Sequence, residues 1–505
     1  MLVRKHFLET KALLREVEPA IIASWLLNDG FFPEQYVLPP TFKVSNFELR
    51  AEPYFPDLTS VKSKFIISVS YPKSALTHRL FGIQHPHHYH DIVYWLMDSW
   101  EAIIEHLFDD EIKIYSYSFP IPLSKKDDLD LSPLRSGRMI YEWIEMAERD
   151  LIVDAVKYNY LARTDITNFY GSIYTHSISW ALHAKDIARK DKSFALLGNK
   201  LDKLMQYSND TKTNGIPVGS ALSDLIAEII LASVDKSISR SLNEVEFVGA
   251  RFKDDYRILC QNEANAKLVI KTISDELMKF NLNINESKTK ITKLPDGLYR
   301  EHSKHYYMHS LSSEKNVSFK KFEMTVLIAM DIHRKFPGTS ILDKFLSELF
   351  YKNKLKIDFS KESSKRSKEL MKVISILLLM KRESEKILSN VLSIIDDVYI
   401  NYKKQHPELK EYLKEKIQDD IILSSSKDSI FDVLWLMFFS KYLKLGIGDV
   451  DLLVNSNVIK ENDFYRSLKS GKQYIFNDSR INLFVLPSTL KDKRLIEYVD
   501  VFKRD

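Results

Sequence analysis

The chain has 505 residues, more than a single hydrophobic core usually organises, so at least two domains are expected. Hydrophobic residues make up 45% of the sequence and charged residues 28%, which is ordinary for a globular protein and excludes an intrinsically disordered chain. Lys and Arg number 73 against 69 Asp and Glu, and the net charge of +4 is too small to indicate nucleic-acid binding by itself.

Cysteine content and apolar runs indicate the compartment in which the chain works. The one cysteine, Cys260, cannot form an internal disulfide and favours a reducing environment. No signal sequence opens the chain, and the longest apolar runs, near residues 373–380 and 430–439, are too short to span a bilayer. We therefore expect a cytoplasmic protein without a membrane partner.

The first 150 residues mix helical stretches with interruptions that contain proline. The pattern predicts a helix over residues 91–107, whereas residues 85–88, His-Pro-His-His, lack the spacing of a metal site and are expected to form a polar loop. Arg79, Arg135 and Arg138 could reach the phosphate oxygens of a ligand. One sequence cannot rank these arginines, so they stay outside the predicted site.

Acidic residues occur at two well-separated positions in the middle of the chain. Residues 160–162, Tyr-Leu-Ala, precede Asp165, and Ile166 follows it, which predicts a buried strand that delivers the carboxylate to an exposed edge. Further along, Asp254 and Asp255 separate two short runs rich in apolar residues. Such a pattern predicts a hairpin whose turn holds two acids together.

Together these acids indicate metal-dependent phosphoryl chemistry. Carboxylates that repel one another approach at lower cost around a cation, and hard oxygen ligands select Mg²⁺ or Mn²⁺. A pair of such ions can activate an attacking hydroxyl and stabilise a leaving pyrophosphate. We predict Asp165 and Asp254 as metal ligands, with help from the Ile166 carbonyl, and we predict Asp165, Asp254 and Asp255 as the catalytic carboxylates of a nucleotidyltransferase.

The segment between the acids predicts a nucleotide pocket. Residues 215–220 form a turn with few bulky side chains that opens an amphipathic helix, so Pro217 and Gly219 are expected to shape the pocket. A second amphipathic helix is expected over residues 266–280, and Lys288 beyond it is predicted to bind phosphate or to protonate the departing pyrophosphate. Each feature alone has an ordinary alternative, such as a turn acid or a solvated lysine, but their joint order favours a polymerase palm.

The order and spacing of these motifs over residues 150–295 resemble the palm of reverse transcriptases. Further residues, at 168–170, 174–180, 215–217 and 29–34, are similar to those of the bacterial abortive-infection reverse transcriptases, the AbiK-like and prophage-borne group. The resemblance to that group thus includes an amino-terminal segment as well as the palm.

The resemblance implies a role for Tyr170, which lies five positions after Asp165. In reverse transcriptases the aromatic residue at this place blocks a ribose 2′-hydroxyl, so the enzyme is expected to bind deoxynucleotides. The sequence departs from the usual pattern at Val218, where templated enzymes often carry glutamine, and at Phe252-Lys253, just before the paired acids. Both departures lie along the nucleic-acid path, where Lys253 could bind a phosphate, and they leave the use of a template open.

Beyond about residue 310, periodic patterns predict helices, for example over residues 370–378 and 387–398, and strand patterns nearly vanish. The predicted fold class is α+β, with reverse-transcriptase-like fingers and palm in residues 1–310 and an α-helical carboxy-terminal domain in residues 311–505. The resemblance implies that this second domain stands in place of a polymerase thumb and forms a HEAT-like helical repeat.

The resemblance also implies an antiphage DNA polymerase of the abortive-infection type, independent of a template and primed by a hydroxyl of the protein itself. Its expected partners are deoxynucleoside triphosphates, a single-stranded DNA product attached covalently to the chain, and further copies of the chain in a homo-oligomer. Two alternatives stay open, an RNA-templated reverse transcriptase and a non-catalytic nucleic-acid-binding scaffold. The priming residue, the phage trigger and the cellular target cannot be read from the sequence.

Overall fold

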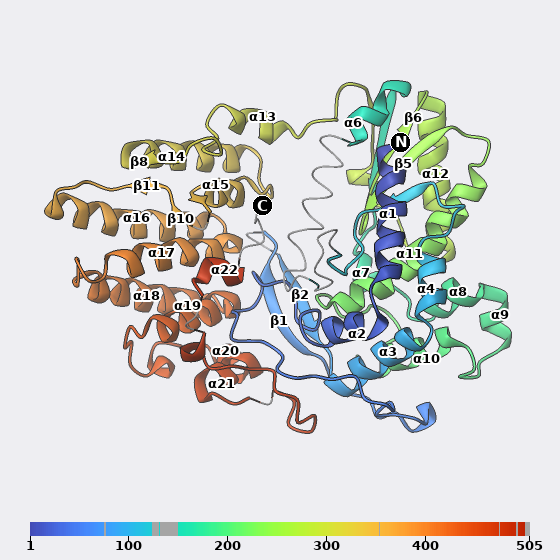
Figure 1. The fold of residues 1–505 in the computed structure, drawn as a ribbon, viewed down its shortest axis with the longest axis horizontal. Helices are drawn as coiled ribbons and strands as arrows, with labels where there is room; N and C mark the ends of the chain where they lie inside the picture. Colours follow the sequence, from blue (N-terminus) through green and yellow to red (C-terminus); the bar gives the residue numbers. More distant parts are fainter. Residues whose placement is uncertain are drawn as a thin grey trace.

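The computed structural model places a sheet with its covering helices on one side of the molecule and a succession of helices on the other, with a two-stranded hairpin between them (Figure 1). The hairpin consists of β1 (Ile67–Pro72) and β2 (His78–Ile83). The structure describes residues 1–74, 77–123, 131, 150–352, 354–473, 475–490 and 493–499.

A five-stranded sheet carries the acidic residues. Its order is β3-β5-β6-β4-β7, in which β3 runs parallel to β5 and the other neighbours are antiparallel. As predicted, one strand ends at Asp165 and a hairpin holds the paired acids, with Asp254 in its turn and Asp255 at the start of the second strand. The strands are β3 (Ile114–Ser116), β4 (Tyr160–Asp165), β5 (Phe247–Phe252), β6 (Asp255–Cys260) and β7 (Lys290–Lys293).

Two long helices that were predicted from their apolar periodicity are confirmed. The first, α11 (Ala221–Ser241), begins where the Ser220 hydroxyl accepts a hydrogen bond from the backbone N–H of Ser223 at 3.1 Å, an N-cap that ends the preceding turn. The second, α12 (Glu263–Lys279), packs on β4 and β6. The shorter elements around them are α6 (Leu151–Asp154), η3 (Ala155–Lys157), α7 (Phe169–Ser172), α8 (Ser177–His183), α9 (Lys185–Lys190), α10 (Leu197–Tyr207) and η4 (Glu286–Lys288).

The amino-terminal part differs from its prediction at the histidine cluster. The expected polar loop is wrong, because residue 86 begins a helix and the His85 ring accepts a hydrogen bond from the backbone N–H of His87 at its start. The helical stretch expected over residues 91–107 is confirmed, with a break at Ser99 where two helices meet. The elements of this part are α1 (Leu2–Glu16), α2 (Pro19–Leu27), η1 (Leu58–Ser60), α3 (Pro86–Asp98) and α4 (Trp100–Leu107).

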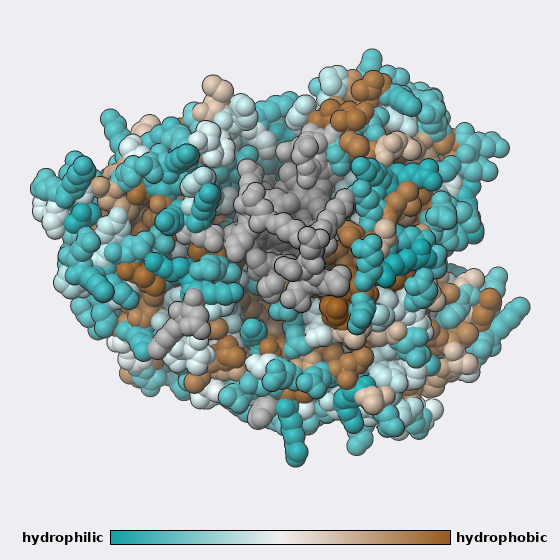
Figure 2. Space-filling view, viewed as in Figure 1, coloured by the Kyte–Doolittle hydropathy of each residue, from teal (hydrophilic) through white to brown (hydrophobic). Residues whose placement is uncertain are grey.

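The carboxy-terminal part is mainly helical, as predicted, and includes the two helices expected from the patterns over residues 370–378 and 387–398. Hydrophilic side chains cover most of the face shown in Figure 2, with hydrophobic ones in small groups. The HEAT-like repeat and the boundary between residues 310 and 311 stay predictions. The elements are α13 (Glu301–Tyr307), β8 (Val317–Ser318), α14 (Phe319–Lys335), α15 (Ile341–Ser347), β9 (Phe350–Tyr351), β10 (Lys354–Leu355), β11 (Ile357–Asp358), α16 (Ser363–Glu383), η5 (Glu385–Ile387), α17 (Leu388–Tyr402), α18 (Leu409–Ser425), α19 (Ile430–Leu443), η6 (Val450–Leu452), α20 (Asn457–Glu461), α21 (Asp463–Ser470), η7 (Pro487–Thr489) and α22 (Leu495–Val499).

A carboxy-terminal segment, residues 475–490, returns to the amino-terminal part. The backbone N–H of Val485 donates to the carbonyl of Thr41 at 2.8 Å. The Asp478 carboxylate forms an ion pair with Lys64 and lies 3.0 Å from Nε2 of His85. Burial lowers the pKa of His85 to about 4, so this imidazole stays neutral at physiological pH. The segment therefore ties the last helices to the first 90 residues.

Within the described ranges, no helix combines the length and the apolar character needed to cross a bilayer.

Candidate active site

Two of the predicted acids meet at one cavity, although they lie far apart in the sequence. Asp165 at the end of β4 and Asp254 in the β5–β6 turn both line a cavity of about 740 Å³. The backbone holds them together, because the N–H of Ile166 donates to the carbonyl of Asp254 at 3.1 Å. Ile166 also lines the cavity. The antiparallel pairing of β4 with β6 therefore brings the first acid beside the second.

The electrostatics of this pair suit a divalent cation. Burial, followed by the negative charge of Asp165, raises the pKa of Asp254, while the positive charges of Lys253 and Arg79 act in the opposite direction. A cation between the two carboxylates would relieve their repulsion, and the donor set of two carboxylates and the Ile166 carbonyl consists of the hard oxygens that Mg²⁺ and Mn²⁺ prefer. Among the described residues, no group of three or more His, Cys, Asp or Glu side chains is placed to hold a metal ion. The predicted ligand set therefore depends on the backbone carbonyl as well as on the pair.

Asp255 has different surroundings from its neighbour. It pairs with Asp165 in the sheet register, but the residues that line the catalytic cavity do not include it. Its side chain is 40% exposed, and the carboxylate lies 3.8 Å from the guanidinium of Arg257. Burial raises the pKa of Asp255, and the positive charges of Arg257 and Arg163 oppose this shift. The second acid of the pair therefore contacts Arg257, and its catalytic role stays a proposal.

Lys288 reaches the same cavity from η4. Its Nζ lies 2.9 Å from Oδ2 of Asp165 and its side chain is 58% exposed, so the ammonium group contacts both the carboxylate and solvent. The sequence gives no sign that Lys288 contacts Asp165, because the two residues are 123 positions apart. The contact arises because β7, which follows η4, pairs with β4.

Tyr170 is linked to an acid that the sequence analysis missed. Its hydroxyl donates to Oδ1 of Asp224, in the first turn of α11, and Nζ of Lys253 lies 3.2 Å from Oδ2 of the same carboxylate. Tyr170, Asp224 and Lys253 all line the cavity. Lys253, which we considered as a phosphate ligand, thus pairs with a carboxylate. The signal for Asp224 was its place one turn after the 215–220 loop.

The loop that holds Pro217 and Gly219 packs against the β1–β2 hairpin, and both residues line the cavity. The N–H of Gly82 in β2 donates to the carbonyl of Val218 at 3.0 Å. Gly219 has a φ of +129°, and a Cβ at this position would lie 2.7 Å from Cδ1 of Phe81, so only glycine fits without displacement. Close backbone approach therefore explains this glycine.

The hairpin contributes a cation to the site. Arg79 in β2 lines the cavity, and its charge acts on Asp254. Arg79 is one of the three arginines that the sequence could not rank, and the other two, Arg135 and Arg138, lie outside the described residues.

A buried ionic network around Arg251 stabilises the β5–β6 turn. The guanidinium of Arg251 forms two hydrogen bonds with Glu228, at 2.9 and 3.0 Å, and one with Asp235, at 2.9 Å. Nη1 also donates to the carbonyl of Lys253 at 3.0 Å. The N–H of Lys253 donates to the Ser118 hydroxyl, which in turn donates to Glu228. The backbone N–H and the carbonyl of Lys253, the residue just before Asp254, are thus both hydrogen-bonded.

A five-stranded sheet brings two carboxylates to one cavity, where a lysine from η4 and an arginine from the β1–β2 hairpin join them, and this is the arrangement expected of a polymerase palm. Residues 113–323 match the sequence profile of the family described as reverse transcriptase (RNA-dependent DNA polymerase). The match is confined to this segment, which contains the five-stranded sheet and both acids of the cavity, and it identifies residues 113–323 as a segment similar to reverse transcriptases.

Solved structures of yeast telomerases are similar to the chain at low identity. Apo telomerase from Candida tropicalis has a TM-score of 0.34 and 11% identity, over 81% of this chain and 70% of that one. Its form truncated from the carboxy-terminal domain has a TM-score of 0.30 and 14% identity, over 49% of this chain, and the chain spans only 52% of that relative. Telomerase from Candida albicans, in complex with a fragment of telomeric RNA, has a TM-score of 0.29 and 11% identity, over 70% and 64% of the two chains. Curated protein sequences give no match.

Proposed function

We propose that the protein is an antiphage DNA polymerase of the abortive-infection, AbiK-like type, which joins deoxynucleotides without a template and starts from a hydroxyl of its own chain. The observation that carries the polymerase part is the shared cavity of Asp165 and Asp254, with Lys288 at 2.9 Å from the first acid. The abortive-infection part rests on the motif resemblance. Antiphage activity, location in the cytoplasm and homo-oligomer formation belong to the same proposal.

Each residue of the cavity has a proposed role. Asp165, Asp254 and the Ile166 carbonyl would hold Mg²⁺ or Mn²⁺, which supplies the positive charge that nucleotidyl transfer requires. Lys288 protonates the departing pyrophosphate or binds its oxygens, since its ammonium group is exposed to the cavity. Asp255 supports the site through the sheet register that it shares with Asp165.

The nucleotide itself is proposed to lie against the other wall of the cavity. Pro217 and Gly219 form a surface with little side-chain bulk, and Tyr170 faces it with its hydroxyl held by Asp224. Phe169 also borders the cavity but is buried in the hydrophobic core, whereas Tyr170 is only half-buried, so Tyr170 is proposed as the aromatic residue that meets the sugar.

Tyr170→Val is expected to weaken the preference for deoxynucleotides. If the ring excludes a ribose 2′-hydroxyl, its removal should reduce the discrimination between dATP and ATP by about 10- to 200-fold, the range for small steric differences in a pocket. The measurement is kcat/KM for each nucleotide. Tyr170→Phe is the matched control, because it keeps the ring and loses only the hydroxyl bonded to Asp224. Unchanged discrimination in Tyr170→Val would refute this role.

Untemplated, protein-primed synthesis is tested with the purified chain, Mg²⁺ and labelled deoxynucleotides, with no added primer or template. We expect label that migrates with the protein after denaturation and disappears on nuclease treatment. Because Tyr36 and Tyr170 are tyrosines that line the cavity, their phenylalanine variants are compared first. Label released fully from the denatured protein would contradict protein priming.

The two alternatives make different predictions. The description of the matching family, an RNA-dependent DNA polymerase, favours an RNA template. In that case the product length would follow the length of an added RNA. A non-catalytic scaffold would keep antiphage activity when Asp254 is replaced, and the shared carboxylate cavity argues against it. Light scattering of the purified chain tests the homo-oligomer.

A further inference from the structure

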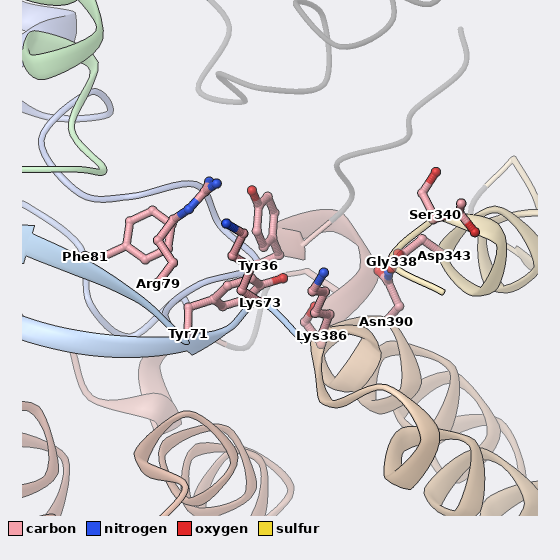
Figure 3. Close-up of a pocket in the computed structure, with 12 residues that line it drawn as sticks. Tyr36, Tyr71, Lys73, Arg79, Phe81, Gly338, Ser340, Asp343, Lys386 and Asn390 are labelled. Carbon is pink, nitrogen blue, oxygen red and sulfur yellow. The ribbon is translucent and has the colours of Figure 1, made fainter. Parts of the chain in front are cut away.

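A second cavity, of about 270 Å³, lies where the β1–β2 hairpin meets the carboxy-terminal helices (Figure 3). Lys73 and Arg79 belong to the hairpin, whereas Lys386 belongs to η5, just before α17. Figure 3 shows these side chains gathered with the rings of Tyr36 and Tyr71. Two parts of the chain more than 300 residues apart in the sequence thus contribute cations to one site.

The charge of this cavity is mainly positive. None of the three cations forms an ion pair with a residue in the described part of the chain. Burial lowers the pKa of Lys386, the negative charge of Asp343 opposes this shift, and the positive charges of Arg79 and Lys73 add to it. The one acid in the lining, Asp343, accepts a hydrogen bond from Nδ2 of Asn390 at 3.0 Å. Burial raises the pKa of Asp343 to about 6, so this carboxyl is still mostly ionised at neutral pH and offsets one of the three positive charges.

Neutral hydrogen-bond donors accompany these charges. Ser389, in the first turn of the 15-residue helix α17, is fully buried and lines the cavity, and its hydroxyl has no hydrogen-bond partner. A buried polar group without a partner costs free energy unless a ligand satisfies it. Burial also raises the pKa of Tyr36 and of Tyr71, so both hydroxyls keep their protons. Three cations and the unpartnered Ser389 hydroxyl therefore face a lining that contains one carboxylate.

We propose that this cavity binds a phosphate group of the DNA strand that leaves the catalytic cavity, through Lys386 and Ser389 of the helical part and Lys73 and Arg79 of the hairpin. The two cavities are continuous in their lining, because Tyr36, Lys73, Arg79 and Phe81 border both. At 270 Å³ the site is smaller than the roughly 300 Å³ at which pockets for whole small molecules begin, which suits one phosphate-bearing unit of a longer strand. The identity of the strand rests on the proposed function.

The test measures binding of a short fluorescein-labelled oligodeoxythymidylate to the full chain by anisotropy, over a series of salt concentrations. Lys386→Gln should raise Kd about tenfold, the usual effect of losing one charge-assisted hydrogen bond. It should also lower the slope of log Kd against log salt concentration by about 0.7, the increment of one phosphate contact on a single strand. Ser389→Ala should weaken binding without lowering thermal stability, because it removes a hydroxyl that lacks a partner in the protein.

Lys404→Gln is the matched control, since it removes the same charge from an exposed position just after α17 and should leave both Kd and slope unchanged. Competition with dTTP and with inorganic tripolyphosphate distinguishes the sources of the phosphate. If Lys386→Gln and Ser389→Ala bind the oligonucleotide like the wild type, the proposal is overturned, and it is also overturned if they weaken only dTTP binding. Loss of oligonucleotide affinity in a chain that shows no polymerase activity would support the site and refute the proposed function.

Discussion

Asp254→Asn is expected to reduce deoxynucleotide incorporation by about 10³-fold or more, a loss of roughly 4 kcal/mol of transition-state stabilisation. The carboxylate lies in the turn that faces Asp165 across the cavity, and an amide is a much poorer ligand for a hard divalent cation. The variant should fold, because it removes one of two carboxylates whose charges repel each other. The measurement is the initial rate of label incorporation, with melting temperature recorded alongside.

Two further variants serve as controls for Asp254→Asn. Asp275→Asn, at an exposed position of α12, makes the same chemical change away from the cavity and should keep full activity. Asp255→Asn should have a smaller effect than Asp254→Asn, since Asp255 contacts Arg257 instead of lining the cavity. Wild-type rates in Asp254→Asn would refute the assignment of the carboxylate pair, and a collapse in melting temperature would assign the loss to misfolding.

Arg251→Met is expected to have the largest effect on stability, lowering the free energy of unfolding by about 3–5 kcal/mol. The guanidinium is buried between Glu228 and Asp235, and removing it leaves two carboxylates without their cation. Burial already raises the pKa of Asp235 to about 6 with the arginine present, which shows how poorly the interior accommodates its charge. Urea unfolding monitored by circular dichroism provides the measurement.

A surface ion pair supplies the comparison for Arg251→Met. Arg240 on α11 binds Glu111, but the two side chains are 59% and 50% exposed, so Arg240→Met should change the free energy of unfolding by about 1 kcal/mol or less. Equal effects of the two substitutions would mean that the buried network contributes no more than a solvated pair. Activity should fall in Arg251→Met even where the chain remains folded, because the Lys253 carbonyl loses its donor beside Asp254.

The local parts of the site could be predicted from the sequence because local patterns encode them. An apolar run that ends in Asp165, two short runs around Asp254 and Asp255, and an apolar stripe after residue 220 specify a strand, a hairpin and a helix by their periodicity. Each is completed within a few residues of its signal. The structure accordingly has all three where they were expected.

The parts that prediction missed depend on partners distant in the sequence. Arg251 and Asp224 look like ordinary surface charges in the sequence, and only the packing of α11 against the strands shows that one is buried and the other bonded to Tyr170. The histidines near residue 85 were assigned to a loop because their polarity and proline content suggested exposure. Instead, His85 and His87 contact Asp478 and Ser479, almost 400 positions later in the chain.

That returning segment also limits how the molecule can move. A lobe joined to its neighbour by a single tether can pivot freely about a few backbone torsions. Here the second lobe is joined to the first by the chain that enters α13 and also by contacts. The Val485 N–H donates to the Thr41 carbonyl, Asp478 lies beside His85, and α19 packs on β1. A wide opening between the two lobes would have to break these contacts. We therefore expect an elongating product to be accommodated by small displacements of the β1–β2 hairpin.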